Sequence, residues 1–175
     1  MTEDTDELQD VATGGDTTTV DLEDLVADLE AKRDELQAQK ERHEAGDDVQ
    51  WPPEGWTGLD FPIQQINHSI DLVRSDIDRF GGSEFVLKKA RAGEAARATD
   101  LVAQDIQASD GEPGTQIASS EHRLVQVCVE RAPPDAPTQA DGTLSTPAFE
   151  RQTFEWLLQR VKNFNQYGVT DIDHF

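Results

Sequence analysis

Two stretches of the chain carry apolar side chains every three or four residues, a spacing that predicts amphipathic helices. In residues 19–46 these positions are Leu22, Leu25 and Leu29, with Asp21 near the positive N-terminal end and Gly46 at the end of the stretch. The heptad positions that follow Leu29 are mostly polar. We therefore expect a helix whose apolar seam weakens toward its C-terminal end.

The second stretch follows Pro62 and has the most regular pattern in the chain. Its seam positions, separated by alternating steps of 3 and 4, are Ile63, Ile66, Ile70, Val73, Ile77 and Phe80. Isoleucine along a heptad seam favours parallel coiled coils of more than two chains. The run is shorter than three heptads, and a helix packed on the core of its own chain explains it too. Both interpretations stay open.

Residues 47–61 form a connector that is rich in proline and glycine, which predicts irregular structure. Trp51 and Trp56 lie inside it. An indole in a loop normally packs on a core or on a partner, because it buries a large apolar surface. We expect this connector to be either a lid over the protein's own core or a contact with another protein.

Gly81 and Gly82 end the seam helix, and Ser83 is then a suitable cap for a third helix that extends to about Ser109. Several alanines and Gly93 give this predicted helix a thin profile. Another helix could therefore approach it closely.

Residues 115–130 fit two patterns. Val125, Val127 and Val129 alternate with more polar residues, which predicts a strand or a hairpin. Leu124, Val127 and Cys128 also share one face of a helix. The pattern favours the strand slightly and leaves the helix as an alternative.

The last predicted helix follows the proline-rich segment 132–147, with Ser145 or Thr146 as its cap and Pro147 just inside it. Its apolar face is wide, which predicts burial on more than one side. Beyond it, Ile172 and Phe175 lie three residues apart in a short tail. Such a tail either docks into a groove of a neighbouring chain or frays.

Together these patterns predict a mainly α protein, a small bundle of about four helices with one strand or hairpin near 115–130. An acidic disordered tail (1–18) precedes the amphipathic helix (19–46) and the connector (47–61). A helical core domain (62–168) and the C-terminal tail (169–175) complete the chain.

The charge of the chain then narrows the range of possible functions. The chain has 36 acidic and 15 basic residues, a net charge of −21, with Asp more frequent than Glu and Arg more frequent than Lys. This composition resembles that of cytosolic proteins of salt-loving archaea, and we expect K⁺ or Na⁺ at the surface. At molar salt the Debye length falls to about 3 Å, so self-repulsion becomes tolerable. Hydrophobic residues make up only 35%, which predicts a modest core or one completed by neighbouring subunits.

The same charge argues against nucleic-acid and membrane-surface roles, because it repels phosphate and anionic lipid. The sequence has no apolar run of about 18–20 residues and no signal peptide pattern. The single cysteine, Cys128, excludes an internal disulfide. We expect a cytoplasmic protein, or a component of a virion assembled in the cytoplasm. A basic cluster, which we expect to meet acidic protein surface, comprises Lys88, Lys89, Arg91 and Arg97.

No motif for catalysis, cofactor binding or metal binding stands out. His43, His68, His122 and His174 do not follow the spacing of a metal-binding helix. The nearest carboxylate pairs lie two residues apart, and on a helix such side chains point away from each other. We therefore predict no catalytic residue, no cofactor and no metal ligand.

The sequence favours a structural or assembly subunit of a homo-oligomer in a halophilic setting, such as a head–tail connector of a haloarchaeal tailed virus. The alternative is a cytosolic regulatory or adaptor protein that binds a different protein, and the third is an enzyme of unrecognised type. The predicted contact residues are Leu22, Leu25, Leu29, Trp51, Trp56, Ile63, Ile66, Ile70, Val73, Ile77, Phe80, Ile172 and Phe175.

Overall fold

A computed structural model describes residues 16–56, 61–109 and 115–166. In these ranges the protein is mainly helical and has a small antiparallel sheet, which confirms the predicted fold class. The elements in chain order are β1 (Thr17–Asp21), α1 (Leu22–Glu44), α2 (Phe61–Phe80), β2 (Glu84–Lys88), α3 (Ala92–Ala108), α4 (Thr115–Cys128), β3 (Val129–Arg131), the 3₁₀ helix η1 (Thr146–Ala148) and α5 (Arg151–Gln166).

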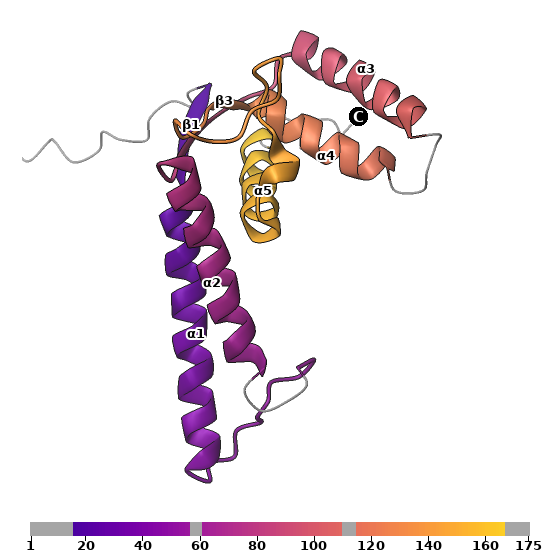
Figure 1. The fold of residues 1–175 in the computed structure, drawn as a ribbon. Coiled ribbons are helices and arrows are strands. Elements are labelled where there is room, and N and C mark those ends of the chain that lie inside the picture. Colours follow the sequence, from indigo (N-terminus) through magenta and orange to yellow (C-terminus); the bar gives the residue numbers. More distant parts are fainter. Residues whose placement is uncertain (1–15, 57–60, 110–114, 167–175) are drawn as a thin grey trace, which may run out of the picture.

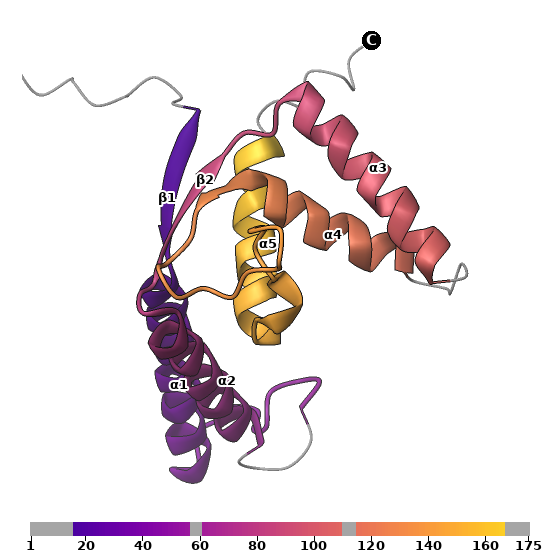
Figure 2. The same cartoon turned by 45° about the horizontal axis from the view of Figure 1, so that its top comes forward.

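Two helical hairpins extend from a centre formed by the sheet and α5. In Figure 1, α1 and α2 run side by side away from the sheet, and α3 and α4 form a second pair on another side. The tilted view in Figure 2 shows β1 and β2 side by side above the hairpin of α1 and α2, and β3 pairs with the other side of β2. α5 contacts both α2 and α4, so it joins the two hairpins.

α1 begins and ends at the residues that the capping rules favour. Asp21 accepts a hydrogen bond from the backbone N–H of Glu23 (3.0 Å), which satisfies one free donor of the first turn. The helix ends at Glu44 with Ala45 as its C-cap, and Gly46 follows with a φ of 87°. The predicted end is thus confirmed. The start is three residues later than predicted, because β1 occupies 17–21.

The isoleucine seam of α2 packs within this chain. Ile70, Val73 and Phe80 are buried in the core, and Ile66 and Ile77 are partly buried against it. α1 lies along α2, and Arg74 on α2 pairs with Glu30 on α1 at 2.6 Å. Of the two interpretations left open by the heptad spacing, the structure therefore supports a helix that packs on its own core.

The third helix begins later than the sequence predicted. Residues 84–88 form strand β2, in which Phe85 and Leu87 are fully buried and their neighbours are more exposed. α3 then starts at Ala92. The predicted helical cap at Ser83 is wrong because the alternation in this short segment matches a strand paired on both sides, with β1 and with β3.

β1 also changes the N-terminal prediction. Thr17 and Thr18 belong to the predicted disordered tail (1–18), but in the structure they pair with Lys88 and Leu87 of β2. The remainder of that predicted tail, residues 1–15, lies outside the described residues.

Segment 115–130 is helical over most of its length. α4 ends at Cys128, and only residues 129–131 form a strand, β3. Val125 and Cys128 are both fully buried, one helical turn apart, so the helix buries both on one side. The predicted strand over 115–128 is wrong, and the alternative helical pattern is correct.

The last helix also starts later than predicted. Pro147 lies in η1, and α5 begins at Arg151. The side chain that fixes this start comes from α2: Asp76 is fully buried and accepts a hydrogen bond from the backbone N–H of Glu150 at 2.9 Å. Arg79 pairs with Asp76 and donates to the carbonyl of Ala148 at 2.7 Å. Two side chains of α2 thus hold the turn before α5.

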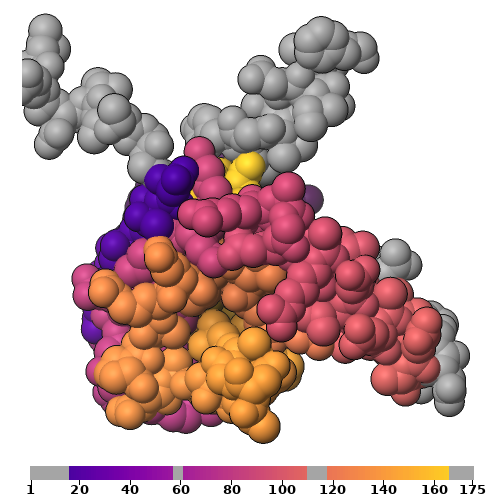
Figure 3. All heavy atoms as spheres, turned by 90° about the horizontal axis from the view of Figure 1, so that it is seen from above, coloured from indigo at the N-terminus to yellow at the C-terminus, as the bar shows by residue number. Residues whose placement is uncertain are grey.

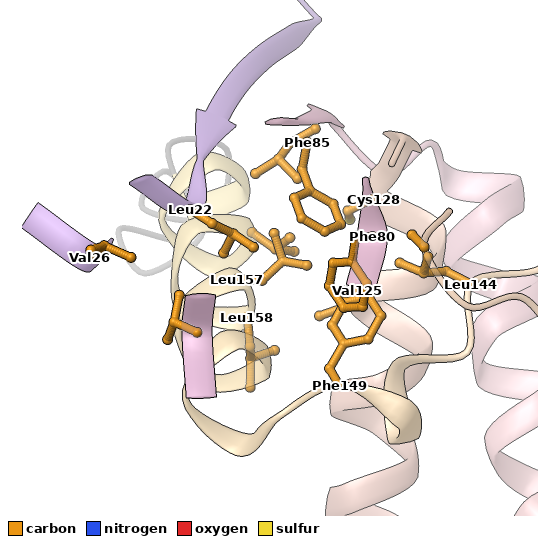
Figure 4. Close-up of a cluster of buried hydrophobic side chains, with 14 of the residues drawn as sticks. Leu22, Val26, Phe80, Phe85, Val125, Cys128, Leu144, Phe149, Leu157 and Leu158 are labelled. Atoms are coloured by element: carbon orange, nitrogen blue, oxygen red, sulfur yellow. The ribbon is translucent and has the colours of Figure 1, made fainter. Parts of the chain in front are cut away.

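The main core lies where β2, α2, α4 and α5 meet, as Figure 4 shows. Phe80 packs against Phe149 with 4.8 Å between ring centroids, and Phe85 lies edge-on to Phe80 at 6.4 Å. Leu157 and Val161 of α5 are fully buried in the same cluster. The wide apolar face predicted for the last helix therefore fills the centre of the molecule.

Candidate protein-interaction surfaces

The hairpin of α3 and α4, here called the arm (residues 92–108 and 115–128), is the less buried of the two helical hairpins in the described part of the chain. α3 contributes no buried residue, although Leu101, Val102 and Ile106 are half-buried. Its main contacts are with α4. Viewed from above, the arm extends beyond the rest of the protein (Figure 3). A whole helix is thus presented on a projection of the fold.

An ion pair fastens the two arm helices together. Arg123 on α4 donates to both carboxylate oxygens of Asp105 on α3, at 3.1 and 3.0 Å, and the Ser119 hydroxyl donates to the same carboxylate. Hydrogen bonding from Arg123 lowers the pKa of Asp105. A bidentate contact of this kind fixes the relative orientation of the two side chains as well as the distance between them. The arm is therefore held in one geometry, although it buries little apolar surface.

A shallow groove runs between the arm helices and has a volume of about 360 Å³. Small and apolar side chains from both helices line most of it, because the alanines of α3 leave space beside α4. This arm groove is lined by Ala90, Ala95, Ala98, Thr99, Val102, Ser120, Arg123, Leu124 and Val127. Apolar side chains of another polypeptide would fit such a surface.

A more polar depression of about 320 Å³ lies beside the same hairpin, where the arm meets residues 139–143. Lys88 and Arg97 from the basic cluster line it, together with Glu94 and Asp141. Lys88 and Glu94 form an ion pair at 2.5 Å. Charges of both signs thus share this surface.

The predicted basic cluster meets groups of its own chain. Besides the pair between Lys88 and Glu94, Lys89 lies 5.8 Å from the ring centroid of Phe164. Arg91 is the N-cap residue of α3, and its backbone N–H donates to Glu94 at 2.9 Å. This cluster therefore helps to start the arm where the chain leaves β2.

The aromatic connector divides into a buried part and an exposed part. Trp51 is 7% exposed, as a lid over the protein's own helices requires. Trp56 is half-buried and lies edge-on to Phe61, with 6.3 Å between ring centroids. Phe61 is 43% exposed, which leaves an apolar ring in contact with solvent.

The side chains that could take part in catalysis, His122 and Cys128, pack against other groups of the same chain. His122 accepts or donates a hydrogen bond with the Thr146 hydroxyl at 2.8 Å and stacks on Phe154, with 4.2 Å between ring centroids. Burial lowers the pKa of His122 and raises the pKa of the Cys128 thiol. A buried neutral thiol is a poor nucleophile. As predicted, Cys128 is a small core residue.

The remaining histidines are dispersed. His43 bonds through Nδ1 to the carbonyl of Val49 at 2.8 Å, and His68 is exposed on α2. His174 lies outside the described residues. Within residues 16–56, 61–109 and 115–166 there is no cluster of three or more histidine, cysteine or acidic side chains that would hold a metal ion. None of the described helices combines the length and the apolar character that crossing a membrane requires.

The predicted contact residues fall into three places. Leu22 is fully buried, and Leu25 and Leu29 pack against the core beside the α2 seam. Trp51 and Trp56 lie at the connector, away from the arm groove. Ile172 and Phe175 lie outside the described residues.

The arm groove was not predicted as a surface. One feature of the sequence points to it, the series of alanines near Gly93, which predicts a thin helix that another helix can approach closely. The groove exists because helix α4 lies opposite those alanines, and the sequence alone does not decide whether residues 115–128 form a helix.

Comparison with known proteins adds no relative from which a role could be transferred. The chain matches no protein-family model, no curated protein and no solved structure. Its function therefore has to be argued from its own surfaces.

Proposed function

We propose that this protein is a non-enzymatic assembly subunit that associates with copies of itself at high salt. The observation that carries the proposal is the arm, a helical hairpin that projects from the fold with an apolar groove along it. A helix normally buries an apolar stripe, and α3 buries no residue fully. Contact with another chain would complete that burial.

The stiffness of the arm supports the same role. The bidentate contact between Arg123 and Asp105 holds α3 at a fixed place on α4. A surface that is fixed before binding loses less conformational entropy when a partner docks. Contact through the arm would therefore be more favourable than contact through a loop of similar area.

Charge explains why we expect this association in concentrated salt. Copies with a net charge of −21 repel each other in dilute buffer. At about 2–3 M KCl the Debye length is only a few ångström, so apolar contacts between copies can dominate. Carboxylates at the surface would hold hydrated K⁺ or Na⁺.

The proposal is tested by expressing a tagged and an untagged copy together and purifying the tagged copy in about 2–3 M KCl. We expect the untagged copy to be retained. Val102→Asp places a charge in the arm groove and should reduce the retained amount by about tenfold, whereas Gln104→Asp on the exposed face of α3 should not.

Two outcomes would contradict the proposal. One is a tagged copy that retains no untagged copy at any salt concentration. The other is stoichiometric retention of a different protein that is lost in Val102→Asp, because this would identify an adaptor instead of a homo-oligomer.

A further inference from the structure

The sheet has an open edge at β1. The strand order is β1-β2-β3, so β1 pairs with β2 on one side only. Within the described part of the chain, no hydrogen bond joins the outward groups of Thr17 or Thr19 to another backbone group. Unpaired donors and acceptors along a strand edge are a template for a further strand.

The register identifies the groups that point outward. Lys89 donates its backbone N–H to the carbonyl of Asp16, and Leu22 donates to the carbonyl of Ser83, both at 3.0 Å. In an antiparallel ladder the residues that bond to one neighbour alternate with those that face the other side. The even-numbered residues of β1 therefore bond to β2, and the odd-numbered residues direct their N–H and C=O groups away from it.

The free outward groups are those of Thr17 and Thr19 and the N–H of Asp21, because the carbonyl of Asp21, the N-cap residue, accepts the first hydrogen bond of α1. The side chains of Thr17 and Thr19 are exposed, whereas Val20 packs against the core from the opposite face. One face of β1 is thus packed on the core, and the side chains of the other face are exposed to solvent.

The other edge of the sheet differs. β3 has only three residues, two of which are charged, Glu130 and Arg131. The register between β2 and β3 also shifts between Val86 and Leu87. Short length, charge and irregular register are the features by which natural sheets protect an edge. β1 has five residues, a regular register and no proline or lysine.

We propose that β1 pairs with β1 of a second copy, antiparallel about a two-fold axis at Thr19, to form one sheet across both copies. Thr19 then faces Thr19 of the second copy, and Thr17 faces Asp21. Thr19 has both outward groups free, so the pair of Thr19 residues can exchange two hydrogen bonds, and each Thr17–Asp21 pair can form one, from the Asp21 N–H to the Thr17 carbonyl. A contact of this kind uses the same surface on both copies.

The local sequence of β1 is compatible with a second copy as the occupant. Residues 1–50 hold 17 acidic and 4 basic residues, a net charge of −13. Thr17–Val20 is a break of four uncharged residues in this region. An equally acidic copy therefore meets no carboxylate over most of the strand. Where it does meet Asp21, the facing residue is Thr17, whose hydroxyl can donate to a carboxylate.

This pairing deepens the proposed function and rests on it, because it identifies one contact through which copies would associate. A pair of five-residue strands is a small interface on its own. We therefore expect it to add a two-fold contact to association through the arm.

Thr19→Pro tests the pairing in the full chain. Proline removes the outward N–H of Thr19 and leaves the bonds from β1 to β2 in place, as edge strands tolerate. Thr19→Val keeps the N–H and a β-branched side chain, and is the matched control. In about 2–3 M KCl we expect the wild type and Thr19→Val to have the same mass in solution. Thr19→Pro should have half that mass.

Backbone amide exchange gives a second readout that needs no variant. In the wild type, the amide of Thr18 should be protected at every protein concentration, because it bonds to β2. The amide of Thr19 should become about tenfold slower to exchange as the protein concentration rises and copies pair. A Thr19 amide that exchanges at one rate at all concentrations would overturn the pairing.

The pairing and the proposed function can fail separately. A wild type that self-associates while Thr19→Pro keeps the full mass would overturn the β1 contact and leave self-association in place. A wild type that stays monomeric in molar salt would overturn both.

Discussion

At the scale of single residues, the described part of the protein is organised by a few side chains that bond to distant backbone. Asp76 is its only fully buried carboxylate, and it accepts hydrogen bonds from Glu150 and Arg79. A pattern of apolar positions cannot reveal such a contact, because Asp76 lies within the seam helix as an ordinary polar residue. This explains why the seam was predicted correctly and the start of α5 was not.

Asp76→Ala should lower the free energy of unfolding by about 3 kcal/mol, because it leaves the Glu150 N–H without its acceptor and Arg79 without its anion. Asp78→Ala removes an exposed carboxylate of the same helix and should change stability by less than about 0.5 kcal/mol. Urea denaturation measures both. Equal effects of the two substitutions would contradict the role given to Asp76.

His122 makes stability depend on pH. Its pKa is lowered in the fold by burial, so the unfolded chain binds the proton first as the pH falls. Stability from this residue is therefore complete above about pH 6.5 and is lost as the pH falls toward the lowered pKa. Thermal unfolding between about pH 7.5 and 5 should show a steeper loss in the wild type than in His122→Gln.

His68→Gln is the control for that experiment, because His68 is exposed on α2. If His122→Gln and the wild type lost stability in parallel over this range, the packing of His122 against Phe154 would not be the cause.

At the scale of elements, the predictions succeeded where one element carries its own pattern. The α2 seam is long and uninterrupted, so its helix follows from its sequence alone. β2 has only five residues, and its stability depends on β1, which is remote in the sequence. α4 carries apolar residues at both two-residue and three-residue spacings near Val125, and only its contacts with α3 and α5 decide between them.

At the same scale, the packing of α3 on α4 depends on the ion pair between Asp105 and Arg123. Asp105→Asn should loosen α3 from α4, because a neutral amide bonds less strongly to Arg123 than a carboxylate does. We expect amides of α3 to exchange about fivefold faster, with no change in α2. Asp100→Asn changes an exposed carboxylate of α3 and should have no such effect. Equal exchange in both variants would show that the ion pair does not fasten the arm.

At the scale of the whole molecule, charge and shape act together. A folded chain with a net charge of −21 is destabilised by self-repulsion in dilute buffer. Its two hairpins project from the core and do not enclose it. The sequence predicted the charge effect directly. The projecting shape could not be predicted, because it depends on how α5 separates the hairpins.

The free energy of unfolding should rise steadily between about 0.1 and 2 M KCl as salt screens the carboxylates. Urea is the suitable denaturant, because it adds no ions. Stability that is independent of KCl, or that falls with it, would contradict the halophilic part of the proposal.

Self-association at high salt is the claim on which the proposed role depends, and sedimentation velocity measures it most directly. The wild type should be compared at increasing protein concentration in about 2.5 M KCl. We predict a mass that rises with concentration to at least twice that of the 19.4 kDa chain. A single species of 19.4 kDa at every concentration would contradict the proposed role.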